Sequence, residues 1–232
     1  MIRKMIKYYR LIGVPKFVFL KKYIKENKNP NIKVLDVGCG NKSPSMTKEL
    51  FPAIEYYGID KEEYNLTEQD KKILIKDKNF FLIDLDSEVE KLDYSIPDNY
   101  FDFVIMNHVI EHLKNGLDVL RIISKKVKVG GSIYIEFPGV RSLGMPSMKG
   151  TLNFCDDPTH VRVYTIQEIA NILLDNGFKI KKAGVRRNWF NVILLPLKLS
   201  FKAIIGREIG AGDFWDLFGF AEFVYAEKIK EV

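Results

Sequence analysis

Short apolar runs alternate along this chain with segments that are long enough to form a helix. Strands that alternate with helices usually pair in parallel and are covered on both faces, so they are apolar throughout. The pattern therefore predicts an α/β fold: a doubly wound, mostly parallel seven-stranded sheet with helices on both faces. The predicted strands cover 33–37, 56–60, 80–84, 102–106, 132–137, 178–185 and 221–230.

Helix-start and helix-stop residues predict three of the intervening helices. Serine before proline and a threonine–glutamate capping box are typical of helix starts, whereas proline and glycine are typical of helix ends. The three predicted helices run from Ser43 to Pro52, from near Gly116 through Lys126 to the glycine pair 130–131, and from Thr165 to the Asn176-Gly177 pair.

Residues 189–220 interrupt this alternation with an apolar run and an aromatic-rich stretch. We interpret them as an apolar insertion between the last two strands. The run at 189–206 is too short, and too interrupted by Pro196 and Lys198, to span a bilayer. Three interpretations of it remain: ordinary core packing, a lid, and a helix that makes peripheral contact with a membrane surface.

The length of 232 residues fits one large domain. We expect a domain over 29–232, preceded by a basic N-terminal helical extension over 1–28. The two cysteines are too few for a disulfide framework, and the N-terminus lacks the pattern of a secretory signal. The prediction is therefore a cytoplasmic location.

The net charge of the chain is +6, and much of the excess lies in 1–28 and near Arg186-Arg187. Such an excess suits an anionic substrate, a membrane surface or a nucleic acid, and it equally suits lysines that only solvate the surface. Because no aromatic-basic motif of a known RNA-binding module is found, we do not expect nucleic acid as a partner.

The strongest chemical signal is the segment VLDVGCG at 34–40, an apolar strand that ends in a glycine turn. Glycines there let the backbone turn sharply and come close to a ligand. Asp60 lies 24 residues after Asp36, at the end of the next predicted strand. A carboxylate at that point can accept hydrogen bonds from both hydroxyls of a ribose, so we predict a cofactor that contains ribose.

Two such cofactors, a dinucleotide and S-adenosyl-L-methionine, can be distinguished. A dinucleotide site needs a third glycine near the pyrophosphate, but Lys42 and Ser43 come after Gly40. Asp36 would repel a pyrophosphate and could instead order the amino end of a methionine moiety, directly or through water. S-adenosyl-L-methionine is therefore the predicted cofactor, and a dehydrogenase is disfavoured.

These motifs make the chain similar to the class I S-adenosylmethionine-dependent methyltransferase superfamily, especially its small-molecule group with a VLDVGCG turn. The likeness covers about 33–188 and extends to IDL at 83–85, YFDFVIMN at 100–107 and VGGSIYI at 129–135. It departs at Lys42, where many relatives have a third glycine.

The resemblance implies a role for each matching residue. Gly38 and Gly40 would pass the methionine part, and Asp60 would hold the ribose. Asp84 would touch adenine, and Asn107-His108 would border the methyl group. The residues expected to bind the cofactor are Asp36, Gly38, Cys39, Gly40, Asp60, Lys61, Asp84, Leu85, Asn107 and His108.

Methyl transfer from a sulfonium is an in-line displacement, and a base can remove the proton when the acceptor is a hydroxyl. The candidate catalytic residues are the histidines His108, His112 and His160. Asp156 or Asp157 could orient the ring of His160. The alternatives are that His112 is a structural residue near the cofactor and that His160 belongs to a turn.

We therefore predict an enzyme that transfers a methyl group to a small-molecule or saccharide acceptor, at a hydroxyl, and we expect no metal. One alternative is a non-catalytic module that binds the cofactor or a related nucleoside. A weaker alternative is a zinc hydrolase, because the run 108–112 matches the HxxEH pattern, in which two histidines share a zinc ion. That alternative leaves the glycine turn without a role.

Overall fold

The computed structural model describes residues 9–40, 42–63, 66–74 and 79–232, so the first eight residues of the predicted extension lie outside it. Within the described residues the strands form one seven-stranded sheet of order β3-β2-β1-β4-β5-β7-β6. All neighbours pair in parallel except β7, which is antiparallel to β5 and β6. The predicted fold class is confirmed. The strands are β1 (Lys33–Val37), β2 (Glu55–Asp60), β3 (Phe80–Leu82), β4 (Phe101–Asn107), β5 (Val127–Pro138), β6 (Phe178–Val185) and β7 (Ala221–Lys228).

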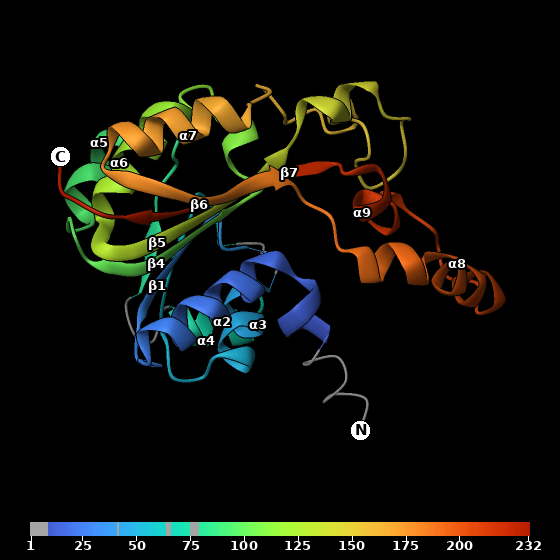
Figure 1. Ribbon diagram of the computed structural model, residues 1–232, viewed down its shortest axis with the longest axis horizontal. Helices are drawn as coiled ribbons and strands as arrows, with labels where there is room; N and C mark the ends of the chain where they lie inside the picture. The colour runs from blue at the N-terminus through green and yellow to red at the C-terminus, as the bar shows by residue number, and fades with distance from the viewer. Residues whose placement is uncertain (1–8, 41, 64–65, 75–78) are drawn as a thin grey trace.

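Helices cover both faces of the sheet (Figure 1). On one face lie α2 (Pro15–Asn27), α3 (Ser43–Leu50) and α4 (Glu68–Leu74). On the other lie α5 (Val89–Ser95), α6 (Gly116–Lys126) and α7 (Ile166–Asp175). The predicted capping box starts α7, where the side chains of Thr165 and Glu168 each accept a hydrogen bond from the other's backbone N–H.

The second predicted helix extends through Lys126 as expected, but the glycine pair 130–131 does not end it. α6 stops at Lys126 and the chain continues directly into β5, so the glycine pair lies inside the strand. The pairing of β4 with β5 shifts there, from Phe101 opposite Val127 to Phe103 opposite Ser132. Gly130 has a φ of +81°, a conformation that a bulge needs and glycine adopts readily.

Helix α2 packs directly on the sheet. Its side chains Phe17, Phe19, Leu20 and Tyr23 are buried. The ring of Phe19 stacks on that of Tyr225 in β7, with centroids 4.5 Å apart. Residues 15–27 are therefore part of the folded core.

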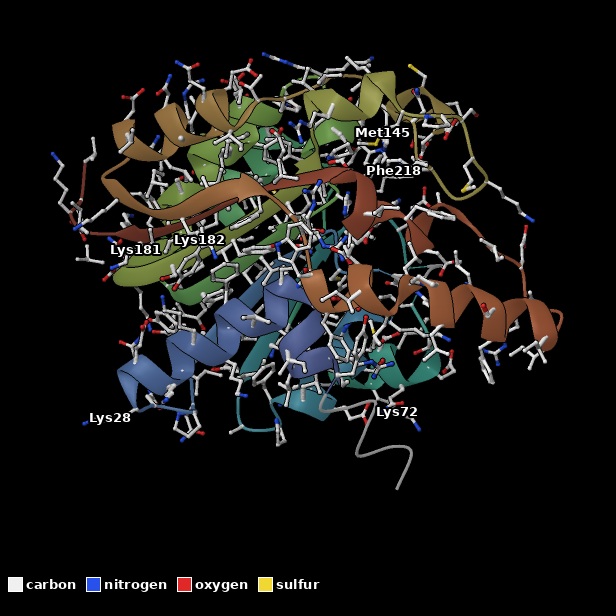
Figure 2. All side chains as sticks on the ribbon, turned by 45° about the vertical axis from the view of Figure 1, so that its right-hand side comes forward. Lys28, Lys72, Met145, Lys181, Lys182 and Phe218 are labelled. Atoms are coloured by element: carbon white, nitrogen blue, oxygen red, sulfur yellow. The ribbon has the colours of Figure 1, made fainter. Side chains whose placement is uncertain are left out.

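Between β6 and β7 lie α8 (Trp189–Ile204), η4 (Ala211–Asp213) and α9 (Trp215–Phe218). α8 projects away from the sheet, and Figure 2 shows the edge strand β6 with Lys181 and Lys182 exposed on the other side of the molecule. Leu195 is the only buried residue of α8, so core packing is the wrong interpretation of this run. No helix among the described residues is long and apolar enough to cross a membrane.

Candidate functional site

The carboxyl ends of β1, β2 and β4 meet at one edge of the sheet. The strand order reverses between β1 and β4, and open α/β sheets bind ligands at such a reversal. The turn after β1 begins at Gly38, whose φ is +70°. A Cβ at this position would lie 2.4 Å from Cγ2 of Val109, in the loop after β4. The glycine therefore permits both the turn and the contact between the two loops.

Lys42 takes the conformation that a glycine would take. Its φ is +65°, and it forms the N-cap position of α3. A lysine can adopt this left-handed conformation at a modest energetic cost, so the turn forms without a third glycine. Ser43 is the first residue of α3 rather than its cap, and its hydroxyl donates a hydrogen bond to a side chain of β1.

Asp60 joins the turn after β1 to the turn after β2. Its Oδ2 accepts a hydrogen bond from the backbone N–H of Gly40 at 3.0 Å, and its Oδ1 accepts one from that of Lys61 at 2.8 Å. Burial raises the pKa of Asp60 and outweighs these hydrogen bonds, which lower it. Each carboxylate oxygen has a further lone pair, so the side chain is positioned to accept hydroxyl hydrogen bonds as well.

The Asp36 side chain, which we expect to order the amino end of the methionine moiety directly or through water, is enclosed by the protein. It is buried on the α2 side of the sheet, where Oδ2 accepts hydrogen bonds from Ser43 Oγ at 2.6 Å and Tyr56 OH at 2.7 Å. The Nζ of Lys16 in α2 lies 3.8 Å from the same oxygen. Asp36 therefore ties α2 and α3 to the sheet, because side chains alternate along a strand and this one points inward.

Cys39 is also turned inward. Its thiol is fully buried and packs against Gly58, where a Cβ would lie 2.4 Å from Sγ. Burial raises the pKa of this thiol, and the nearby carboxylates of Asp36 and Asp60 raise it further. Cys39 can contribute only its backbone to the site.

The turn after β3 holds Asp84 and Leu85. Oδ1 of Asp84 accepts a hydrogen bond from the backbone N–H of Asp86 at 3.0 Å, which lowers the pKa of Asp84. Leu85 is buried in the core. Asp84 therefore remains half-exposed at the edge, and Leu85 supports the turn from below.

Asn107 and His108 end β4 at the strand reversal. The side-chain Oδ1 of Asn107 is buried and has no hydrogen-bond partner among the described residues. A buried oxygen of this kind is expected to bind a ligand or water. His108 has a φ of +52°, and its backbone N–H donates to the carbonyl of Glu136 at 2.8 Å.

The ring of His108 lies between two carboxylates. Nδ1 is 3.2 Å from Glu111 Oε1, and Nε2 is 3.2 Å from Glu136 Oε1. Burial alone would lower the pKa of His108, but its hydrogen bonds to Glu111 and Glu136 raise it to about 9. The ring is therefore a cation at neutral pH and cannot act there as a general base.

The same network extends into the insertion. Arg186 Nε lies 3.6 Å from Glu136 Oε1, and Arg186 Nη2 lies 3.7 Å from Asp216 Oδ2 in α9. The ring of His108 also packs on that of Trp215, with centroids 5.2 Å apart. Burial raises the pKa of Glu136, but its hydrogen bond to His108 and the charge of Arg186 lower it to about 2. Arg186 is thus an internal ion-pair partner and not part of a free basic surface.

The sequence prediction missed Glu136, Arg186 and Asp216 as members of this site. Glu136 had a signal, because a single carboxylate inside the apolar strand IYIEFP must find a cationic partner once buried. Asp216 had none, since it comes from a segment with no strand or helix pattern to place it.

His112 and His160 come together, with ring centroids 4.8 Å apart. The carbonyl of Phe154 orients His160 through Nδ1 at 2.7 Å, and Asp157 Oδ2 lies 3.9 Å from its Nε2. Asp156 does not orient His160, because its Oδ2 accepts three backbone hydrogen bonds in the preceding loop.

The zinc-peptidase arrangement is not formed. In that pattern both histidines of the run 108–112 face one metal ion. Here the two ring nitrogens of His108 face Glu111 and Glu136, while His112 faces His160. Residues Ile110–His112 form a single 3₁₀ turn, not the α-helix that the pattern requires.

The chain is similar in sequence to a methyltransferase family and to a curated methyltransferase. Residues 8–183 match the model of a family described as a methyltransferase domain. Over 124 residues the chain is 32% identical to the mitochondrial ubiquinone biosynthesis O-methyltransferase of Dictyostelium discoideum. That match covers 48% of this chain and 39% of the relative, so it spans less than half of the curated protein.

Solved structures share the fold. The S-adenosylmethionine-dependent methyltransferase of Mesorhizobium loti aligns with a TM-score of 0.61 at 14% identity, over 94% of this chain and 99% of that one. The corresponding structure from Archaeoglobus fulgidus aligns with a TM-score of 0.52 at 23% identity, over 95% of this chain and 98% of that one.

Proposed function

The chain belongs to the methyltransferase-domain family, within the class I S-adenosylmethionine-dependent superfamily, and from that membership we propose that it transfers a methyl group from S-adenosyl-L-methionine to a hydroxyl of a small-molecule acceptor. The observation that carries the proposal is the hydrogen bond from Gly40 to Asp60. It holds a carboxylate beside a glycine turn at the strand reversal, as a ribose-containing cofactor requires.

We propose that the remaining cofactor contacts follow the same edge. Gly38 would pass the methionine part, Asp84 would reach the adenine, and the unpartnered Oδ1 of Asn107 would face the cofactor near its methyl group. Lys61 would contribute its backbone beside Asp60. Asp36 and Cys39 support this edge only indirectly, because both side chains are buried below it.

The acceptor is proposed from two observations. The curated relative is by name an O-methyltransferase of ubiquinone biosynthesis, which supports a hydroxyl acceptor. The exposed apolar side of α8 lies at the same end of the sheet, which favours an acceptor with an apolar part over a saccharide. We also propose that residues 189–206 make the predicted peripheral contact with a membrane.

The proton of the acceptor would be lost beside His112 and His160. Thr159 donates its own hydroxyl hydrogen to Asp157, so Thr159 Oγ1 must accept from Nδ1 of His112 at 2.9 Å. The carbonyl of Phe154 can only accept, so His160 also carries its hydrogen on Nδ1. Nε2 of each ring therefore carries a lone pair, which can accept a proton or bind another electron-pair acceptor.

Calorimetric titration with S-adenosylmethionine, S-adenosylhomocysteine and NADH tests the cofactor. We expect the first two to bind, and Asp60→Ala to weaken both by about 100-fold, because two ribose hydrogen bonds to a charged group are lost. Glu63→Ala is the matched control, since it removes an exposed carboxylate from the same loop. Binding of NADH alone would contradict the proposal. Binding of S-adenosylmethionine without methyl transfer to any phenol, lipid or sugar would favour a non-catalytic module.

A further inference from the structure

Three potential metal ligands meet beside the proposed acceptor site. They are Glu111 and His112, from the 3₁₀ turn after β4, and His160, from the loop before α7. One ligand atom of each lies within 4.8 Å of the others. The loop is held against the turn because the backbone N–H groups of Val161 and Arg162 donate to the carbonyl of Glu111.

The carboxylate of Glu111 is incompletely satisfied. Its side chain is 1% exposed, and Oε1 faces His108. Oε2 is buried and has no hydrogen-bond partner among the described residues. A buried carboxylate oxygen without a partner is costly, so this atom is expected to meet a cation or a donor that the polypeptide does not supply.

Both histidines are prepared to bind through the same nitrogen. Nδ1 of His160 donates to a carbonyl, and Nδ1 of His112 donates to Thr159, which leaves each Nε2 with its lone pair. Metal-binding histidines usually donate their other ring N–H to an oxygen in this way, because that bond fixes both tautomer and orientation.

We propose that Glu111, His112 and His160 bind one divalent transition-metal ion of the zinc class. Two imidazoles and one carboxylate suit zinc and other first-row ions rather than magnesium or calcium. Zinc with ligands at about 2.0–2.1 Å holds them about 3.4 Å from one another. The three ligand atoms here lie within 4.8 Å of one another, so they need to approach by up to about 1.4 Å.

Three protein ligands leave a position for an oxygen of the acceptor, and this role rests on the proposed function. The ion lowers the pKa of a bound hydroxyl, whose proton passes to water. The resulting oxyanion attacks the methyl carbon, so an O–C bond forms while the S–C bond breaks and S-adenosylhomocysteine leaves. In this role His112 and His160 are ligands and not bases.

Metal binding can be measured without methyl transfer. Untagged, chelator-treated protein is titrated with Co²⁺, followed by visible absorption, and with Zn²⁺, followed by calorimetry. We expect one equivalent to bind. His112→Ala, His160→Ala and Glu111→Gln should each weaken binding by about tenfold or more. Cys155→Ser is the matched control, because this exposed free cysteine could bind zinc adventitiously.

Failure of this inference can be distinguished from failure of the proposed function. Wild-type protein that binds S-adenosylhomocysteine but no stoichiometric Co²⁺ overturns the metal site alone, whatever the variants do. Loss of the metal in Cys155→Ser, or a thiolate charge-transfer band, also overturns it. Far-ultraviolet circular dichroism of each variant shows that it folds, and the milder His112→Gln and His160→Gln replace any variant that does not.

Discussion

Gly38 and Gly130 share a left-handed backbone but differ in their surroundings. Their φ angles are +70° and +81°, yet only Gly38 has a neighbour, Val109, where a Cβ would be. Left-handed backbone costs an alanine about 1 kcal/mol, and overpacking adds about 1–3 kcal/mol. We expect Gly130→Ala to lower the free energy of unfolding by about 1 kcal/mol and Gly38→Ala by clearly more.

Urea unfolding of the two glycine variants measures this difference. Gly38→Ala should also weaken S-adenosylhomocysteine binding, because Val109 must move away from the turn. Equal destabilisation by both substitutions would show that the contact between the two loops contributes nothing.

His108 should make stability depend on alkaline pH. Its folded pKa of about 9 is above the ordinary value of 6.5, so the stabilisation is complete below about pH 6.5 and is lost as pH rises through 9. The shift corresponds to on the order of 3 kcal/mol. We expect the free energy of unfolding to fall across this window in wild type and not in His108→Gln. A His108 ring that titrates near pH 6.5 by NMR would show that Glu111 and Glu136 do not stabilise its protonated form.

Glu136 should act in the opposite direction. Its folded pKa of about 2 is below the ordinary value of 4.5, so its contribution is complete above about pH 4.5 and is lost as pH falls towards 2. We expect Glu136→Gln to remove part of the acid sensitivity seen by urea unfolding between these values. It should also lower the pKa of His108, which the same NMR titration would detect.

Sequence spacing predicted the positions of Gly38 and Asp60 because both depend on local rules, a turn after one strand and an acid after the next. It did not predict the burial of the Asp36 side chain, since the partners Tyr56 and Lys16 come from other elements. The charge of His108 depends on Glu136, brought opposite Asn107 by the register of two strands. Short-range sequence patterns do not predict the register between β4 and β5.

At the scale of elements, α8 shows how one pattern allows several structures. Trp189, Ile193, Leu197 and Phe201 recur every four residues, a spacing that fits core packing and membrane contact equally well. The distinction lies in the surroundings, because this stripe is exposed. Local signals correctly placed the start of α7 at its capping box and the extent of α6, whereas the glycine pair predicted to end α6 lies inside the bulged strand that follows it.

The stripe on α8 should bind vesicles without contributing to folding. Ile193 is 73% exposed and Leu197 is 69% exposed. We expect Ile193→Asp and Leu197→Asp each to weaken binding to phosphatidylcholine–phosphatidylglycerol vesicles by about tenfold, measured by co-sedimentation, because burial of one such side chain contributes about 1.5–3 kcal/mol. Tyr94→Asp, an equally exposed position on α5, should leave binding unchanged. Unaltered binding in all three would exclude α8 as the contact.

At the scale of the whole molecule, α2 is part of the domain rather than an appendage to it. Phe19 is 8% exposed, whereas Phe201 on α8 is 59% exposed. We expect Phe19→Ala to lower the free energy of unfolding by about 3–5 kcal/mol and Phe201→Ala to change it by less than about 0.5 kcal/mol. Urea unfolding compares the two. Similar small losses would mean that α2 can leave the sheet without disturbing it.

The ion pair between Arg186 and Asp216 constrains how the insertion can be exchanged during evolution or in a designed chimera. Replacing 189–220 with the corresponding segment of a relative removes Asp216 and leaves a buried guanidinium beside Glu136 with one counter-charge fewer. A transplanted segment must therefore bring its own acid or be accompanied by a change at Arg186. In this fold, an exchanged insertion that alters the range of acceptors must therefore also keep Arg186 paired if the sheet is to remain stable.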